Sequence, residues 1–449
     1  MRNLSLFAAI LWTAVSAPAA PDPRFDGQGS GQTAPEALEA PCAPEAPATF
    51  PADQRLWVVI DAGDAKTRTA AATAGVSIEE VRPGQISGFA TPAALARAKA
   101  AGLKVLSSEP LSRRFPAKDF PGKDAAYHNF AETAAELKSL AGKAPDIASL
   151  FSIGKTTQGR DIWALRLCPD AKDSAASKKP GILFIGMHHA REHLSNEVPL
   201  LLAKRLIESR SDPEVARLLA SRDVYVVPML NPDGGEYDLS GDKYHMQRKN
   251  MSRNGDGTVG VDLNRNYAWG WGGEGASAYP GDDTYRGPSA FSEPETKAVK
   301  AFIEARKNLT TLLSYHTFSE LVLYPWGGSD EPIADKDALA AYQVMAAEMG
   351  RMTGYTPMQS SGLYVATGDF TDWSWGAHGI FSWTFEMTPK SMWDGGFYPG
   401  VTAIASSVQA NWRPMLYLID LADNPRRAAK GPGLSAFAPA PENNMENTR

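Results

Sequence analysis

Four side chains that can bind a metal ion follow a short apolar segment near the middle of the sequence. Residues 181–187 are all apolar or glycine, and His188, His189, Glu192 and His193 come soon after them. A run of this length with branched and aromatic side chains is typical of a buried strand. Polar residues at the end of such a strand lie where open α/β sheets bind ligands. His189 and Glu192 are three residues apart, so one helical turn or tight loop can direct both at a single ion.

This spacing allows two kinds of metal site. In the first, His189 and Glu192 are ligands and a third ligand comes from far downstream. In the second, His189 and His193 bind zinc and Glu192 is the base, as in inverted zincins. The second site requires a regular helix from His189, whereas helix signals begin only at Ser195, so we favour the first. A polar loop that binds no metal is the remaining alternative for this fragment alone.

His316 is the candidate for the third ligand. It ends the apolar segment 311–316, so it has the same strand-end position as His189. A ligand from a neighbouring strand end completes three protein ligands and leaves one zinc position for water. Two separate strand-end histidines make the metal-free alternative much weaker.

Strand and helix patterns alternate around these residues. Strands are predicted at 150–153, 162–167, 181–187, 224–230, 309–316, 321–324 and 381–385, and helices at 127–140, 196–209, 292–306, 338–352 and 401–421. This alternation predicts one α/β domain, residues 119–421, in which helices cover the sheet. Residues 422–449 are expected to form a C-terminal tail.

A smaller domain is expected before the large one. Residues 52–114 show a strand–helix–strand–strand–helix–strand order, which is typical of a ferredoxin-like α+β domain. This domain carries none of the residues that we propose for chemistry. The segment 112–116 is basic and contains proline, so Arg113–Arg114 is a candidate cleavage junction.

The first 51 residues have the composition of an export segment. Residues 1–20 contain an early arginine, a short apolar stretch and small residues, as in a secretory signal, which predicts a secreted or periplasmic protein. The apolar stretch is too short to favour a membrane span, and no later run is long enough for one. Residues 21–51, rich in Pro and Ala, predict a flexible linker. Cys42 and Cys168 can form a disulfide in an export compartment, but processing can remove Cys42, so the pairing stays open.

The charge balance argues against nucleic acid as the main partner. The 449 residues include 45 Lys and Arg against 51 Asp and Glu, a formal net charge of −6. A chain of this length can form more than one domain with a large core. A mildly acidic surface does not attract a polyanion.

The motifs around these residues resemble those of a known family. They are His189-Ala-Arg-Glu192, Arg248-Lys-Asn250, Asp262-Leu-Asn-Arg-Asn-Tyr267, Ser314-Tyr-His316, Leu323-Tyr-Pro-Trp-Gly327, Tyr364 and Thr384-Phe-Glu386. In their order and spacing over residues 127–421, they are similar to the zinc metallocarboxypeptidases of the funnelin type, the family of the digestive carboxypeptidases and of bacterial carboxypeptidase T. Each motif is weak alone, but together they are highly specific. The resemblance implies an α/β domain whose mixed central sheet is covered by helices on both faces, preceded by a small α+β ferredoxin-like domain.

The same resemblance implies one zinc ion bound by His189, Glu192 and His316. Zinc polarises the scissile carbonyl group and lowers the pKa of a bound water. Glu386 matches the general base and proton shuttle, and its apolar strand neighbours should partly desolvate the carboxylate. Arg248 matches the residue that stabilises the oxyanion.

Four further residues match substrate-binding positions of the family. Asn264 and Arg265 match the clamp for a free C-terminal carboxylate, which the planar guanidinium binds through two parallel hydrogen bonds. This clamp implies an exopeptidase whose substrates are peptides and proteins with a free C-terminus. Tyr364 matches the mobile tyrosine that closes over the bound terminus, and Arg191 matches a subsite arginine.

The substrate preference is expected to depend on Thr371 and Asp369. By its spacing from Tyr364, Thr371 should lie at the floor of the side-chain pocket, with Asp369 nearby. Family members that cleave basic residues carry an acid at the floor, and those that cleave apolar residues carry an aliphatic side chain. Thr371 is neither, and Asp369 can attract Lys or Arg from the side. We therefore expect a mixed preference, apolar and aromatic residues first and basic residues accepted.

The small domain resembles the activation segment of the family. We expect it to cover the cleft as an inhibitor until the chain is cleaved at the basic junction, and we expect a monomer. Two other functions are compatible with parts of the same sequence pattern. A catalytically silent peptide-binding module is disfavoured because Glu386 and all three ligands are present. An inverted-zincin endopeptidase that uses His189 and His193 leaves Asn264, Arg265 and His316 without a role.

Overall fold

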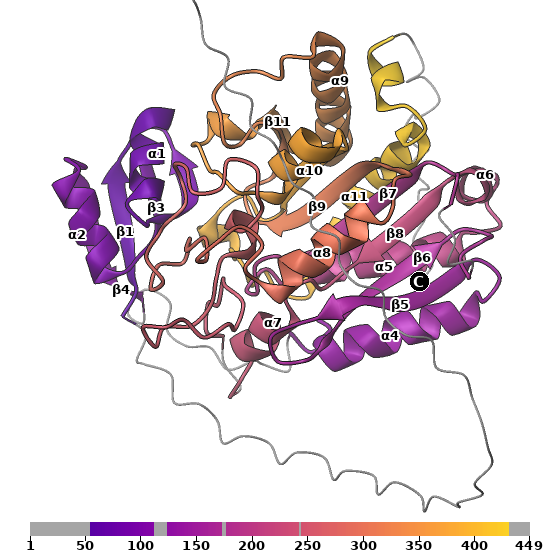
Figure 1. The fold of residues 1–449 in the computed structure, drawn as a ribbon, viewed down its shortest axis with the longest axis horizontal. Helices are drawn as coiled ribbons and strands as arrows, with labels where there is room; N and C mark the ends of the chain where they lie inside the picture. The colour runs from indigo at the N-terminus through magenta and orange to yellow at the C-terminus, as the bar shows by residue number, and fades with distance from the viewer. Residues whose placement is uncertain (1–53, 112–123, 173–176, 242–243, 431–449) are drawn as a thin grey trace, which may run out of the picture. The chain divides into compact units, whose positions relative to one another are not determined.

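Two β-sheets and their helices make up the protein in the computed structural model, which describes residues 54–111, 124–172, 177–241 and 244–430 (Figure 1). Both sheets belong to one compact unit. The expected signal segment, the linker with Cys42 and the Arg113–Arg114 junction lie outside the described residues. Those predictions therefore remain predictions.

The smaller sheet has the ferredoxin-like arrangement expected from the sequence. Its strands are β1 (Leu56–Asp61), β2 (Ser77–Arg82), β3 (Gln85–Ala90) and β4 (Val105–Pro110), in the antiparallel order β2-β3-β1-β4. Helices α1 (Ala65–Thr73) and α2 (Pro92–Ala100) connect them. Asp64 and Thr91 cap these helices, because each side chain accepts a hydrogen bond from a backbone N–H of the first turn.

The larger sheet has eight strands and is mixed. In the order β11-β10-β12-β9-β7-β8-β6-β5, the central strands β12, β9, β7 and β8 are parallel, whereas β10, β6 and β5 run antiparallel to their inner neighbours. The bounds are β5 (Ala148–Lys155), β6 (Asp161–Leu167), β7 (Gly181–Gly186), β8 (Asp223–Val227), β9 (Leu309–Thr317), β10 (Leu321–Tyr324), β11 (Thr356–Gln359) and β12 (Phe381–Met387).

Helices cover both faces of this sheet. Ile182 and Phe184 point into one core and Leu183 and Ile185 into the other, as the two-residue period of a strand requires. The first core is closed by α4 (Phe130–Lys143), α5 (Leu194–Glu208), α6 (Pro213–Ser221), α9 (Lys336–Thr353) and α11 (Thr402–Leu421), and the second by α8 (Pro294–Glu304) and α10 (Phe370–His378). The expected fold class is therefore confirmed. None of the described helices combines the length and the apolar character needed to cross a membrane.

The structure differs from the expected elements in a few places. The sequence patterns did not predict α6, α10 or β11, nor the short helix α7 (Pro232–Asp238). The helix α10 is rich in aromatic residues and contains Gly376, so its intrinsic helix propensity is low and packing must stabilise it. The turn Pro425–Ala429 packs against the protein, and Arg427 bonds to Asp420 across 2.6 Å, so these residues are not part of the tail expected from residue 422.

The carboxyl ends of β7, β9 and β12 meet at one edge of the sheet. Parallel β7 and β9 pair Gly186 with Tyr315, and parallel β9 and β12 pair His316 with Glu386. Glycine is required at 186, because a Cβ there would lie 1.8 Å from the carbonyl oxygen of Ser195 at the start of α5. This close approach holds the loop between β7 and α5, which carries His189, against the end of the sheet.

Candidate active site

His189, Glu192 and His316 converge at this edge. His189 Nδ1 lies 2.7 Å from Glu192 Oε1, and His316 Nδ1 lies 3.0 Å from Glu192 Oε2 and 3.2 Å from His189 Nδ1. All three side chains are buried. Two imidazole nitrogens and one carboxylate whose ligand atoms lie within 4.8 Å of one another are the donor set of a catalytic zinc site.

The outer nitrogen of each histidine has its own partner. His189 Nε2 lies 3.2 Å from Asp262 Oδ1, and His316 Nε2 lies 3.1 Å from Ser314 Oγ. These contacts leave both Nδ1 atoms directed at Glu192. Burial lowers the pKa of His316, which favours the neutral imidazole that a metal ligand must be. Asp262 opens the motif that contains Asn264 and Arg265, but no local pattern of the sequence assigns it this contact with His189.

Glu386 stands next to the three ligands. It lies on β12 in register with His316 and is partly exposed to the adjoining cavity. Its deep position raises the pKa of the carboxyl group well above its ordinary value, and the negative charge of Glu192 raises it further. The group can therefore hold a proton beside the ligand cluster.

Arg248 places a fixed positive charge beside the candidate ligands. Its Nε and Nη2 atoms both lie 2.9 Å from Asp262 Oδ2, and its Nη1 lies 3.5 Å from His189 Nδ1. Burial opposes the charge, but Asp262 keeps the pKa of Arg248 above its ordinary value. The guanidinium is thus both charged and held in place.

Asn264 and Arg265 lie on the short 3-10 turn Leu263–Arg265. The side-chain oxygen of Asn264 accepts a hydrogen bond of 2.9 Å from the backbone N–H of Phe370. Arg265 donates to the carbonyl oxygens of Gly275 and Asn264 at 3.2 and 2.7 Å. None of the described carboxylates forms an ion pair with Arg265, so its charge is available to an anionic ligand.

Thr371 and Asp369 lie at the start of α10. Asp369 caps this helix: its Oδ1 accepts from the N–H of Asp372 at 2.9 Å and from the hydroxyl of Thr371 at 2.8 Å. The sequence predicted that Asp369 lies near Thr371 at the side-chain pocket. It did not predict that Asp369 caps α10 and accepts a hydrogen bond from Thr371.

One cavity connects these groups. Its volume is about 610 Å³, and it is lined by His189, Glu192, Arg248, Asn264, Arg265, Tyr364, Asp369, Thr371 and Glu386. Tyr364 is half-buried, and burial raises the pKa of its hydroxyl group. The cavity is also lined by residues 78–82 of the small domain.

Arg191 is the predicted substrate-binding residue that does not line the cavity. Its side chain is fully buried between Glu79 of the small domain, at 2.7 Å, and Asp283, at 3.1 Å. Its guanidinium also lies over the rings of Phe89 and Phe397, at 4.8 and 4.4 Å from their centroids. Side chains of both domains thus enclose Arg191, through contacts between distant segments that local sequence patterns cannot reveal.

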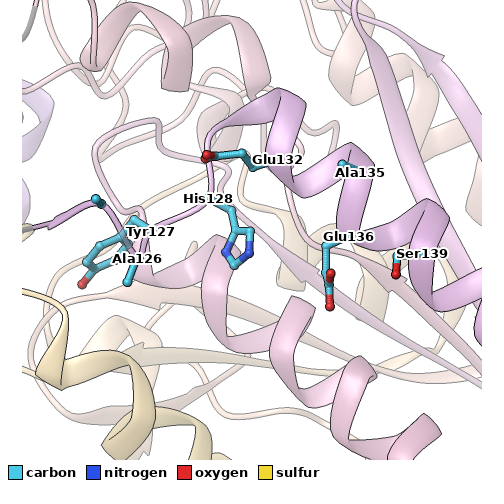
Figure 2. A pocket seen from close by; sticks show the side chains of 8 residues that line it. Ala126, Tyr127, His128, Glu132, Ala135, Glu136 and Ser139 are labelled. Carbon is cyan, nitrogen blue, oxygen red and sulfur yellow. The ribbon is translucent and has the colours of Figure 1, made fainter. Parts of the chain in front are cut away.

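The remaining histidines lie outside the ligand group. His193 Nε2 bonds to Asp238 at 2.9 Å, which disfavours the inverted-zincin arrangement. His128 pairs with the buried Glu197 at 2.8 Å and borders a second, open hollow of about 520 Å³. Figure 2 shows that Glu132 and Glu136 of α4 flank this hollow, and none of the candidate catalytic residues lies there.

Comparisons with known proteins agree with this geometry. The sequence model of the zinc carboxypeptidase family matches residues 133–414. A zinc carboxypeptidase of Saccharothrix mutabilis subsp. capreolus is 33% identical over 387 residues, covering 81% of this chain and 88% of that protein. Carboxypeptidase A1 of Homo sapiens is 30% identical over 303 residues, covering 66% of this chain and 70% of that protein.

The fold is shared with solved structures as well. The crystal structure of carboxypeptidase A from Helicoverpa armigera superposes with a TM-score of 0.68 at 22% identity, covering 85% of this chain and 100% of that chain. The family match and the two sequence relatives show that this chain is similar to zinc carboxypeptidases in sequence as well as in fold. The chain therefore belongs to the zinc carboxypeptidase family, whose members are hydrolases acting on peptide bonds.

Proposed function

We propose that this chain removes single residues from the C-terminus of peptides and proteins, with zinc as its cofactor. One observation carries the proposal: two members of the ligand group, His189 and Glu192, line the same cavity as Glu386 and Arg265. A substrate whose terminal carboxylate binds Arg265 presents its last peptide bond to the ligand group. A chain that continues past Arg265 has no carboxylate to place there.

The donor set fits a catalytic zinc ion. His189 Nδ1, the Glu192 carboxylate and His316 Nδ1 would hold it, because the ligand atoms of these residues lie within 4.8 Å of one another. When bound, zinc supplies a Lewis acid for the scissile carbonyl group and lowers the pKa of a water molecule.

Glu386 and Arg248 are proposed to act on the reacting groups. Glu386 accepts the proton of the attacking water and returns it to the leaving amine. Its raised pKa supports this role, since a carboxyl group that titrates nearer neutrality can both accept and release a proton. Arg248 donates hydrogen bonds to the oxyanion, and its ion pair with Asp262 orients the guanidinium before substrate arrives.

The two arginines of the cavity differ in a way that supports separate roles. Arg248 is neutralised by Asp262, whereas Arg265 bonds to backbone carbonyl oxygens. A charge without a carboxylate partner suits the binding of a substrate anion. Asn264 and Tyr364 are proposed to complete the clamp from either side of Arg265.

The proposed preference is mixed, with apolar and aromatic C-terminal residues first and basic ones accepted. Leu321 and Leu323 give the cavity apolar lining, and Asp369 and Thr371 give it a polar side. We further propose that the protein is exported, that the small domain inhibits the uncut chain and that the trimmed enzyme is a monomer. The signal-like segment 1–20 and the basic junction 113–114 support export and activation by cleavage.

Peptide hydrolysis by the zinc-loaded protein, trimmed at Arg113–Arg114, tests the proposed activity. A mixed pool of peptides is offered with free and with amidated C-termini, and mass spectrometry identifies the products. Free peptides should lose residues one by one from the C-terminus. Amidated peptides should react at least about 30-fold more slowly, because leaving the Arg265 charge unpaired costs about 2 kcal/mol or more.

The His316→Ala variant is the control, since it should lose zinc and hydrolysis together. Cleavage of internal bonds while terminal residues stay attached would contradict the proposal. So would equal rates on free and amidated peptides.

A further inference from the structure

His188 is a fully buried histidine that the proposed reaction does not use. Its ring stacks on that of His316, with centroids 5.5 Å apart and planes 19° apart, and contacts the ring of Phe370 at 5.1 Å. The carbonyl oxygen of His188 accepts a hydrogen bond of 3.2 Å from the side chain of Asn231. A buried polar ring in this position needs hydrogen-bond partners for its own nitrogens.

Those partners form a chain that ends at a candidate ligand. His188 Nε2 lies 3.0 Å from the hydroxyl of Tyr267, and His188 Nδ1 lies 3.4 Å from Ser314 Oγ. Ser314 Oγ lies in turn 3.1 Å from His316 Nε2. The side chains come from the loop after β7, from the loop after residues 263–265 and from β9, so the folded sheet edge assembles the chain.

The donor and the acceptor of each hydrogen bond in this chain can be assigned by counting the protons that the side chains carry. If His316 Nδ1 is an acceptor toward a metal ion, its proton is on Nε2 and is donated to Ser314 Oγ. The single hydroxyl proton of Ser314 then goes to His188 Nδ1, and a neutral His188 donates from Nε2 to Tyr267. Every bond then has one donor and one acceptor, so the chain is compatible with His316 as a ligand through Nδ1.

We propose that His188, with Tyr267, is a positioning residue for His316. Acting through Ser314, it holds the imidazole ring in the orientation that directs Nδ1 at zinc. The inference rests on the proposed zinc site. His189 is oriented by the carboxylate of Asp262, whereas His316 is oriented by this neutral chain, so the two ligand histidines have different outer partners.

Zinc affinity and the spectrum of a cobalt-substituted protein test the role without a turnover assay. The full chain is prepared as His188→Leu, which removes both nitrogens, and as Ser314→Ala, which removes the link. Both variants should bind zinc about 10-fold or more weakly in competition with a chelator. Both should also shift the visible absorption bands of the cobalt(II) protein, because the geometry around His316 changes.

Two further variants separate positioning from general packing. His188→Asn keeps an acceptor near the position of Nδ1 and should retain zinc affinity within about threefold. His193→Asn is a matched control, since His193 is also buried and also adjacent in sequence to a candidate ligand, but bonds to Asp238 outside the chain. Its zinc affinity and cobalt spectrum should match those of the unmodified protein.

Unchanged zinc affinity and an unchanged cobalt spectrum in folded His188→Leu would overturn the proposal. If that variant does not fold, Ser314→Ala decides the question in the same way, because it removes a single oxygen atom. The outcome is separate from that of the proposed function: a protein that binds zinc through His316 but releases no C-terminal residue contradicts the activity and leaves the positioning role standing. A protein in which zinc does not bind His316 overturns both.

Discussion

Asp369 is the residue that we expect to decide whether basic C-terminal residues are accepted. It lines the cavity. Burial, and then the charge of Asp369, raise the pKa of the neighbouring Asp372 well above its ordinary value. Asp369→Asn should lower kcat/KM about 10- to 100-fold for substrates ending in Lys, because a charge-assisted bond is lost. Measurements of kcat/KM on hippuryl substrates ending in Phe, Lys and Glu test this expected loss.

Substrates ending in Phe are the internal control for Asp369→Asn. Asparagine also caps helices well, so α10 should remain intact and the rate on Phe should change little. An equal loss on all three substrates would mean that Asp369 acts only by capping α10. A strong preference of the unmodified enzyme for Glu would contradict the proposed specificity itself.

At the scale of a secondary-structure element, the start of α8 contains a buried acid. Glu295 is fully buried, and the side-chain amide of Asn250 donates to both Glu295 and Glu293, at 3.0 and 2.8 Å. Because Asn250 follows Arg248 closely in the sequence, this contact also ties the loop that carries Arg248 to α8. Burial raises the pKa of Glu295 to about 7.

This raised pKa predicts how stability depends on pH. Between the ordinary pKa of 4.5 and about 7, the folded protein keeps a proton on Glu295 that the unfolded chain releases. The contribution of Glu295 to the free energy of unfolding is therefore present below pH 4.5 and is lost as the pH rises toward 7 and above. Glu295→Gln should remove this dependence and stabilise the protein at pH 8, relative to pH 5, by up to about 3 kcal/mol.

Urea unfolding at pH 5 and pH 8 measures the effect. Glu304→Gln, on the same helix but partly exposed and paired with Lys300, is the control and should leave the pH dependence unchanged. The same difference between the two pH values in the unmodified chain and in Glu295→Gln would contradict the assignment.

At the scale of the whole molecule, the small domain contacts the site in two places. Glu79 on β2 pairs with Arg191, and residues around it line the cavity. On α1, Thr69 Oγ1 accepts from the N–H of Val365 at 2.8 Å, and Arg68 donates to the carbonyl oxygen of Leu363. These two backbone groups flank Tyr364, so the small domain both lines the cavity and bonds to the loop that carries this tyrosine.

We therefore expect the uncut chain to be the slower enzyme. An inhibitor joined to its target acts at an effective concentration on the order of millimolar, so hydrolysis should be at least about tenfold slower before cleavage than after it. Limited proteolysis at Arg113–Arg114, followed by kcat/KM measurements on both forms, tests this. A chain with Arg113→Gln and Arg114→Gln should stay slow after the same treatment, and equal rates for cut and uncut enzyme would refute the inhibitory role.

The central strands were the most predictable part of the fold. The strand β10 has the bounds expected from the sequence, and β7, β9 and β12 differ from expectation by one or two residues at their ends. Strands buried on both faces are short continuous apolar runs, which are visible in a single sequence. By contrast, β11 is largely exposed and contains Pro357, and α10 owes its stability to contacts of Phe370 and Trp373 with Tyr267, so neither has a local signal.

The sequence by itself determined the types of group that can do chemistry and the strand ends that carry them, because ligand spacing and apolar runs are local properties of the chain. Only the tertiary structure decided how those groups are held. The bond between His189 and Asp262, the contact between His188 and Ser314 and the ion pair of Glu79 with Arg191 join residues 73, 126 and 112 positions apart. No local pattern encodes such pairs, since they exist only once the sheet edge and the two domains have come together.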